Sequence, residues 1–177
     1  MYRSNSSRYG LVAILIHWIS ALLIIGLFAA GLIAANTANI EDKLILLRIH
    51  VPLGMFVMLL TLARLAWWSL ADKKPASLAT NLAWQNSAAK VVHRLLYAVT
   101  IGMALSGVAM LAMSGAGDLL FGNSTKDLPD FWDFGPRFGH WVMAWLLLAL
   151  LIMHVAAAFY HQFVLRDNLM ARMGVRK

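Results

Sequence analysis

The 177-residue chain contains no cysteine. This absence excludes disulfide bonds, iron–sulfur clusters held by thiolates, and covalent attachment of a haem through a Cys-x-x-Cys-His motif. Charge is also scarce, since Asp, Glu, Lys and Arg make up 13% of the residues, against about 25% in an average soluble domain. Any prosthetic group must therefore be held by coordination and packing, in a chain with little polar surface.

The residues that replace charge are apolar: 61% of the chain is hydrophobic. A helix that spans a membrane needs ~20 apolar residues, and four stretches of this kind predict spans at about 11–35, 44–70, 92–116 and 138–165. Arg48 and Arg64 lie near the two ends of the second span, where arginine can reach the headgroups or pair internally. Pro52 is expected near the start of that span. The sequence predicts an all-α integral membrane protein, a four-transmembrane-helix bundle in which residues 1–177 form a single domain.

The net charge is +7, but the basic residues flank the apolar runs instead of forming the stripe typical of nucleic-acid binders, so no nucleic-acid partner is expected. Eleven basic residues fall on the side that holds both termini and the second loop, against four on the other side, which predicts cytoplasmic N- and C-termini. The eleven are Arg3, Arg8, Arg64, Lys73, Lys74, Lys90, Arg94, Arg166, Arg172, Arg176 and Lys177; the four are Lys43, Arg48, Lys126 and Arg137.

All six histidines lie within or at the edge of a predicted span. An ionisable side chain inside a membrane is costly and indicates function by default, although a helix–helix hydrogen bond explains one such histidine equally well. His140 and His154 are fourteen residues apart, which is ~21 Å and nearly four helical turns. They face the same direction at two depths, so one helix can hold two cofactors.

Depth selects a partner for each of them. His17, early in the first span, is expected at the level of His154, and His50, early in the second, at the level of His140. Two axial histidines for each iron suit electron transfer, because an open position invites oxygen chemistry. We therefore predict two haem b groups with His17, His50, His140 and His154 as the iron ligands.

Three arginines are candidates to bind haem propionates: Arg64 for the inner haem, and Arg48 and Arg137 for the outer one. Interfacial anchoring explains each of them equally well. His93, Arg94 and His161 lie at the inner edge and form a possible quinone site, since imidazoles can hydrogen-bond to carbonyls and deliver protons. His93 and His161 are alternatively partners of propionates, or ligands of the inner haem.

Several short motifs occur in a distinctive order along the chain. They are Ile16-His17-Trp18, Ile49-His50 with Gly54, His140-Trp141, His154-Val155-Ala156-Ala157-Ala158, and His161 followed by Arg166-Asp167-Asn168. Over nearly the whole chain they resemble the bacterial cytochrome b561 family. The resemblance implies a di-haem b-type cytochrome of the bacterial inner membrane whose ligands are the four histidines chosen by depth. It also implies superoxide oxidation at the periplasmic side and ubiquinone reduction within the membrane lipid. Related cytochrome b subunits instead anchor a dehydrogenase or hydrogenase and pass its electrons to quinone.

The electron donor stays open between superoxide and a redox partner protein. An anionic radical is drawn by positive potential, yet the outer side carries six acids against four basic residues. Lys43, Arg48, Lys126 and Arg137 can still focus the field locally. A transporter with histidine metal or proton sites is a third reading, but it would suit acidic residues inside the spans, and the predicted spans contain none.

Overall fold

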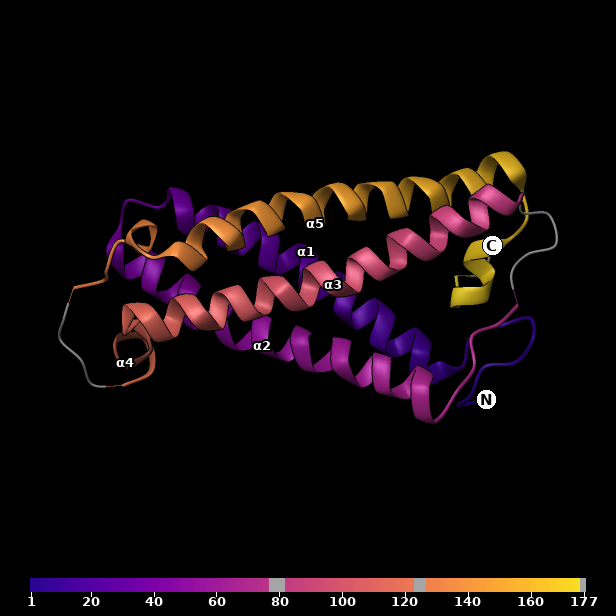
Figure 1. Cartoon of the computed structure of the whole chain (residues 1–177), viewed down its shortest axis with the longest axis horizontal. Coiled ribbons are helices and arrows are strands. Elements are labelled where there is room, and N and C mark those ends of the chain that lie inside the picture. Colours follow the sequence, from indigo (N-terminus) through magenta and orange to yellow (C-terminus); the bar gives the residue numbers. More distant parts are fainter. Residues whose placement is uncertain (77–81, 123–126, 176–177) are drawn as a thin grey trace.

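The computed structural model describes residues 1–76, 82–122 and 127–175, and the chain within them is helical (Figure 1). Four of its helices are long and apolar enough to cross a membrane, which confirms the predicted all-α fold with four spans. Lys126, Arg176 and Lys177, which entered the charge count, lie outside the described residues. The elements are α1 (Leu11–Asn36), α2 (Ile40–Leu70), α3 (Ala83–Ser114), α4 (Ala116–Phe121), the 3₁₀ turn η1 (Phe131–Asp133), α5 (Gly135–Phe159), the π-helical turn η2 (Tyr160–Leu165) and the 3₁₀ turn η3 (Leu169–Met173).

The second helix begins earlier than the apolar run predicted. Asn39 accepts hydrogen bonds from the amides of Glu41 and Asp42, and acids in a first turn complement the helix dipole. The helix therefore starts in charged sequence, at Ile40. Pro52 consequently lies well inside α2, so the expected place near the start of the helix was wrong, and its missing N–H leaves an interior carbonyl without the usual donor.

The third helix is displaced relative to its predicted range. It begins at Ala83, nine residues before the predicted start at 92. The prediction missed these first turns because they carry polar and basic residues, which a search for uncharged sequence rejects. It ends at Ser114, since Gly115 adopts a left-handed conformation with φ of 66°. Glycine adopts this conformation without a Cβ penalty and commonly ends helices in this way.

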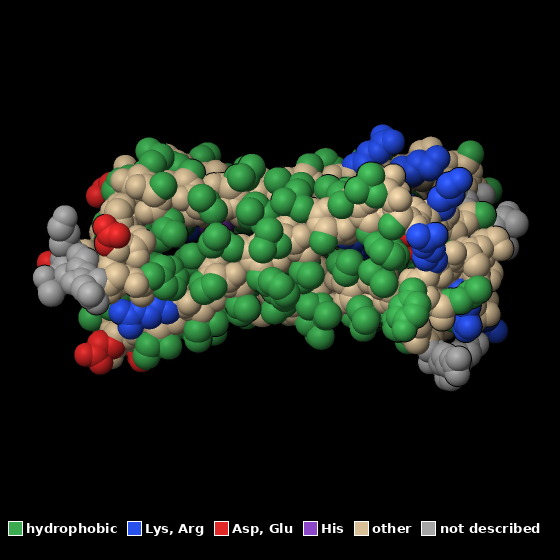
Figure 2. Space-filling view, turned by 90° about the horizontal axis from the view of Figure 1, so that it is seen from below, with side chains coloured by type: hydrophobic (Ala, Val, Ile, Leu, Met, Phe, Trp, Pro, Cys, Tyr) green, Lys and Arg blue, Asp and Glu red, His purple; other side chains and the backbone are tan. Residues whose placement is uncertain are grey.

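The four long helices form two pairs. α1 packs chiefly along α2 and α3 chiefly along α5, while α2 and α3 meet over a smaller area. A small buried core of Val99, Leu147 and Leu150 joins α3 to α5, and Ile24 of α1 packs against it. Most other apolar side chains face outward along the length of the bundle, as Figure 2 shows. Such a surface suits lipid, because a helix satisfies most of its backbone groups within itself.

The two ends of the bundle differ in charge. Both termini lie at one end, here called the terminal end, and α4 and η1 lie at the other, here called the loop end (Figure 1). Lysine and arginine side chains gather at the terminal end and acidic side chains at the loop end in Figure 2. This is the asymmetry on which the predicted orientation depends.

The two chain termini fold together over the terminal end. The Trp18 Nε1 donates to the carbonyl of Met173 at 3.0 Å, and the Tyr9 amide donates to the carbonyl of Arg172 at 3.2 Å. The Arg172 Nε donates in turn to the carbonyl of Ser7 at 3.1 Å. The N-terminal segment is thereby held against η3.

Asp72, just after α2, ties the N-terminal segment to the bundle. Its carboxylate accepts hydrogen bonds from the Ser4 amide at 3.0 Å and from the Ser4 hydroxyl at 2.7 Å. Partial burial favours the neutral acid, but hydrogen bonds from Ser4, Lys73 and Trp67 outweigh it, so the pKa of Asp72 lies below its usual range. The ionised carboxylate of Asp72 therefore stabilises the docked segment, and this stabilisation is complete at pH values above the ordinary carboxyl pKa. It is lost as the pH falls through the lowered pKa of Asp72 and the carboxylate is protonated.

We therefore expect Asp72→Asn to release the N-terminal segment at neutral pH, because the amide accepts these bonds without charge assistance. Limited proteolysis of the first ten residues should be faster in the variant, and the wild type should approach the variant's rate only in acid. Asp133→Asn at the loop end is the control and should change nothing at the N-terminus. Equal cleavage of wild type and Asp72→Asn at neutral pH would contradict this role.

Candidate functional site

The four histidines selected by depth meet as two pairs. The ring centroids of His17 on α1 and His154 on α5 are 6.1 Å apart, and those of His50 on α2 and His140 on α5 are 6.3 Å apart. Each pair joins α5 to a helix of the α1–α2 pair. His50 and His140 line one cavity with residues of the loop end, whereas His17 lies beside Arg64 toward the terminal end.

These separations match an iron held between two imidazoles. A ligating imidazole nitrogen lies about 2 Å from a transition metal and the ring centre roughly 1 Å behind it, so two axial rings have centres roughly 6 Å apart. His93 of α3 lies closer to His154, with 5.3 Å between ring centroids. This spacing is shorter than that of two imidazoles on opposite faces of one haem and corresponds to a ring-to-ring contact.

Glycines make room for both histidines near the loop end. A Cβ on Gly31 would lie 3.1 Å from the His50 ring, and a Cβ on Gly107 would lie 3.4 Å from the His140 ring. Each ring therefore lies against the backbone of a neighbouring helix, and at Gly31 even a methyl group would press on the histidine ring.

The backbone at the Gly107 notch fixes the tautomer of His140. Its Nδ1 lies 3.0 Å from the carbonyl oxygen of Met103, four residues before Gly107. A carbonyl can only accept a hydrogen bond, so Nδ1 carries the proton and Nε2 keeps a free lone pair. A metal-ligating histidine commonly has this arrangement, with its other ring nitrogen donating to a fixed acceptor.

The cavity that holds His50 and His140 has the size and polarity for a haem. Its volume is about 470 Å³, and apolar side chains of the four long helices form most of its wall. Ligand pockets usually have volumes of about 300–1,000 Å³ and place a few polar groups in an apolar lining. Here the cations Lys43 and Arg137 line the cavity together with the two histidines and one acid, Asp130. The residues present therefore fit a flat apolar macrocycle with anionic substituents.

Arg64 contacts a predicted ligand directly. Its Nη1 lies 3.2 Å from the Nδ1 of His17. A guanidinium only donates, so in this contact the Nδ1 of His17 accepts and its proton sits on Nε2. Iron ligation through Nε2 thus requires Arg64 to turn toward another acceptor, and a propionate of the same haem is an acceptor of the right charge.

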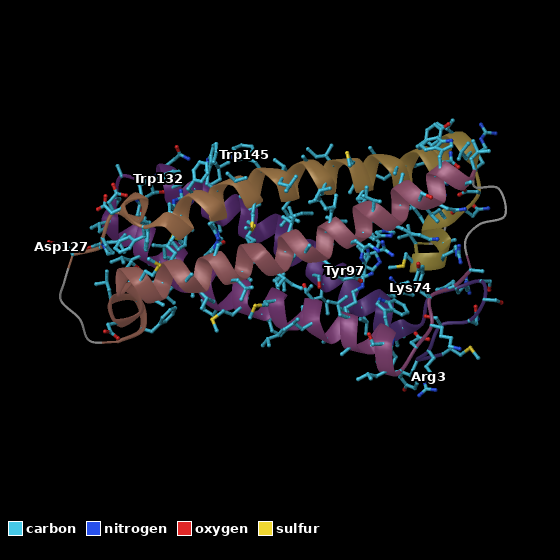
Figure 3. The ribbon with its side chains drawn as sticks, viewed as in Figure 1. Arg3, Lys74, Tyr97, Asp127, Trp132 and Trp145 are labelled. Atoms are coloured by element: carbon cyan, nitrogen blue, oxygen red, sulfur yellow. The ribbon has the colours of Figure 1, made fainter. Side chains whose placement is uncertain are left out.

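Further cations surround Arg64 at the terminal end. The Lys74 Nζ lies 5.7 Å from the Trp68 ring centroid, and the Arg64 guanidinium lies 5.9 Å from that of Tyr97. In Figure 3, Lys74 is labelled toward this end and Tyr97 nearer the middle of the bundle. Burial, and then the nearby charges of Arg64 and Arg94, lower the pKa of Lys74. This concentration of positive charge suits an anionic group.

The other predicted propionate partners lie at the loop end. Arg137 lines the cavity and its guanidinium stacks 4.5 Å from the Trp132 ring centroid. Arg48 instead donates through Nε to the carbonyl of Leu120 at 3.0 Å, which ties α2 to α4. Lys43 lines the same cavity, so it is a candidate of the same standing as Arg137.

His161 forms a hydrogen bond with an acidic residue, Asp167, that was not among the predicted site residues. Its Nδ1 makes a 2.5 Å hydrogen bond with Asp167, whose side chain is 4% exposed. η2 widens the last helical turn, and the left-handed residues Arg166 and Asn168 then turn the chain so that Asp167 faces back onto His161. π-helical turns and left-handed non-glycine residues occur preferentially at functional sites.

The three residues of the predicted quinone site are not joined directly. His93 contacts His154, and His161 contacts Asp167. Within residues 1–76, 82–122 and 127–175, no hydrogen bond or ring contact links His93 to His161. Arg94 follows His93 on α3 and its side chain is exposed. A shared ligand would therefore have to bridge two separate imidazoles.

Four membrane-spanning helices that carry facing histidine pairs define a membrane protein suited to hold haem within the bilayer. The chain belongs to the prokaryotic cytochrome b561 family, which it matches over residues 8–174. It is similar to cytochrome b561 homolog 2 of Escherichia coli (strain K12), with 25% identity over 97% of this chain and 94% of that protein. It is also similar to cytochrome b561 homolog 1 of the same organism, with 26% identity over 97% of this chain and 99% of that protein. No solved structure matches the chain. The protein is thus a multi-pass membrane cytochrome that binds b-type haem and transfers electrons.

Proposed function

We propose that the protein binds two haem b groups and carries electrons along the bundle from the loop end to the terminal end. The proposal rests on two histidine pairs, His17 with His154 and His50 with His140. In each pair the distance between the ring centroids is close to that expected for two histidines that hold one haem iron. A haem held by two imidazoles supplies one-electron transfer and leaves no open position for oxygen. Arg64 would bind a propionate of one haem, and Lys43 and Arg137 those of the other, with Arg48 holding α4 beside it.

The proposed orientation places the terminal end in the cytoplasm and the loop end in the periplasm of a bacterial inner membrane. The gathering of lysine and arginine at the terminal end supports this, because loops rich in these residues stay on the cytoplasmic side. Electrons would then enter from outside and leave near the cytoplasmic surface.

The proposed reaction is oxidation of superoxide and reduction of ubiquinone. Two superoxide anions each give up one electron and become dioxygen, and the quinone takes two electrons and two protons to become the quinol. Whichever of Lys43 and Arg137 is not paired with a propionate would draw the anion locally. At the terminal end, His93, Arg94 and His161 would bind the quinone carbonyls and supply protons.

Stopped-flow spectroscopy of the purified protein tests the reaction. Superoxide should reduce the haems on the time scale of stopped-flow mixing, and a short-chain ubiquinone should then reoxidise them. Superoxide dismutase added before mixing should abolish the reduction. Haems that stay oxidised under superoxide, yet are reduced by dithionite, would overturn the proposed donor.

A second candidate is a membrane anchor that passes electrons between quinone and a partner dehydrogenase or hydrogenase. The acidic loop end favours it, because Glu41, Asp42, Asp118, Asp127, Asp130 and Asp133 repel an anion and attract a basic protein surface. This protein would be inert toward superoxide and would co-purify with a soluble subunit in salt-sensitive fashion.

Asp167 is expected to matter for quinone reduction. Asp167→Asn keeps the shape of the side chain but removes the charge that fixes the His161 tautomer, and lost proton transfer should slow quinone reduction by about a hundredfold. The rate should be compared as kcat and KM for the quinone, with haem reduction by dithionite as the reference. Asp133→Asn serves as the matched control. Unchanged quinone kinetics in Asp167→Asn would exclude this role.

A further inference from the structure

The two histidines of the pair near the loop end differ in the hydrogen bonds of their Nδ1 atoms. The Nδ1 of His140 lies 3.1 Å from the Ser106 hydroxyl, in addition to its contact with the Met103 carbonyl. The Nδ1 of His50 is buried and makes no hydrogen bond of good geometry to a described residue, although the Leu27 carbonyl lies near it. Only one of the two rings is thus anchored by a side chain.

The hydrogen of the Ser106 hydroxyl takes part in a hydrogen bond to the backbone and is not available to His140. Its Oγ donates to the Met103 carbonyl at 2.7 Å, so the hydroxyl presents a lone pair to the protonated Nδ1 of His140. His140, Ser106 and Met103 therefore form a closed triangle in which one N–H is shared between two oxygens.

We infer that Ser106 is a positioning residue that lowers the reduction potential of the haem at the loop end, by accepting a hydrogen bond from His140. The inference rests on the proposed ligation by His50 and His140. A fixed acceptor on the outer nitrogen makes an imidazole a stronger electron donor to its metal. A stronger donor stabilises the ferric state more than the ferrous state, and so lowers the potential.

Removing the hydroxyl has two opposing effects. The direct acceptor is lost, while the Met103 carbonyl loses a donor and becomes a slightly better acceptor itself. The direct contact acts on the N–H of the ligand, whereas the gain of the carbonyl acts through one more bond, so the loss dominates. The lower potential at the loop end then favours electron flow from that haem toward the terminal end.

The test compares Ser106→Val with Ser106→Thr, two side chains of nearly equal shape that differ in the hydroxyl. Spectroscopic redox titration of the purified holoprotein should show a raised potential for one haem in Ser106→Val, by about tenfold in the reduction equilibrium constant, or about 59 mV for one electron. Ser106→Thr should keep the wild-type potential. Electron paramagnetic resonance of the ferric protein should show altered signals for the same haem in Ser106→Val alone.

Ser114→Ala is the matched control, because Ser114 also lies on α3, and its hydroxyl donates to the carbonyl of Leu111 and accepts from the amide of Ala116, neither of which is a histidine. It should leave both potentials unchanged. The haem in question is identified as the one that His50→Ala removes. Equal potentials in the Thr and Val variants would overturn the role of Ser106. Protein that contains only one haem before any substitution would instead overturn the proposed function.

Discussion

Replacing His140 with alanine should halve the haem content of the purified protein and leave the remaining haem with two histidine ligands. The haem proposed at the loop end would lose one of the two histidines that hold it, together with the hydrogen bonds that position that histidine, whereas His17 and His154 lie in a separate pair at 6.1 Å. His50→Ala should give the same spectrum, since it removes the other side of the same pair. The pyridine haemochrome assay, normalised to protein, measures this, and redox titration should resolve one potential in place of two.

His93→Ala is the control for a histidine in the same bundle that is not expected to hold iron. Its ring centroid lies 5.3 Å from that of His154, which is shorter than the roughly 6 Å expected for two histidines on opposite faces of a haem. The variant should keep both haems. Loss of a haem in His93→Ala would make His93 a ligand in place of His17, and loss of both haems in His140→Ala would show that the two sites are not independent.

The sequence predicted the pairing of the histidines because helical geometry is regular. Fourteen residues along one straight helix place His140 and His154 at two depths whatever the loops do. The residues at which the helices begin and end were harder to predict from the sequence. Asn39 as a cap and Gly115 in the left-handed region act through local backbone geometry, and a search for uncharged runs does not detect such signals.

The contacts that orient the rings could not be read from the sequence. Gly31 and Gly107 were visible as small residues, but only the packing shows that each faces a histidine ring. The partner of His161 depends on a π-helical turn and two left-handed residues that bring Asp167 back over one turn. Irregular backbone of this kind has no periodic signature, so the signal available was the short spacing of a histidine and an acid.

Haem should also hold the two helix pairs together. Each predicted iron joins α5 to the α1–α2 pair, while direct packing is concentrated within the pairs. A ligand present at roughly 1,000 times its Kd stabilises the state that binds it by about 4.1 kcal/mol. Protein produced under haem limitation should therefore keep its helical circular dichroism but lose the fixed distance between the pairs.

The absence of cysteine makes this measurable with pairs of introduced spin labels. Leu22 on α1 and Ile152 on α5 are 70% and 59% exposed. Labelled cysteines at these two positions would report the distance between the helix pairs. Cysteines at Leu105 on α3 and Ile152 report the distance within one pair. Electron–electron double resonance should show a narrow α3–α5 distance with and without haem, and an α1–α5 distance that broadens only without it. If the α1–α5 distance stays narrow in the haem-free protein, the side-chain contacts between the pairs, such as Phe28 with Trp145, suffice to hold the bundle, and the haems would serve electron transfer alone.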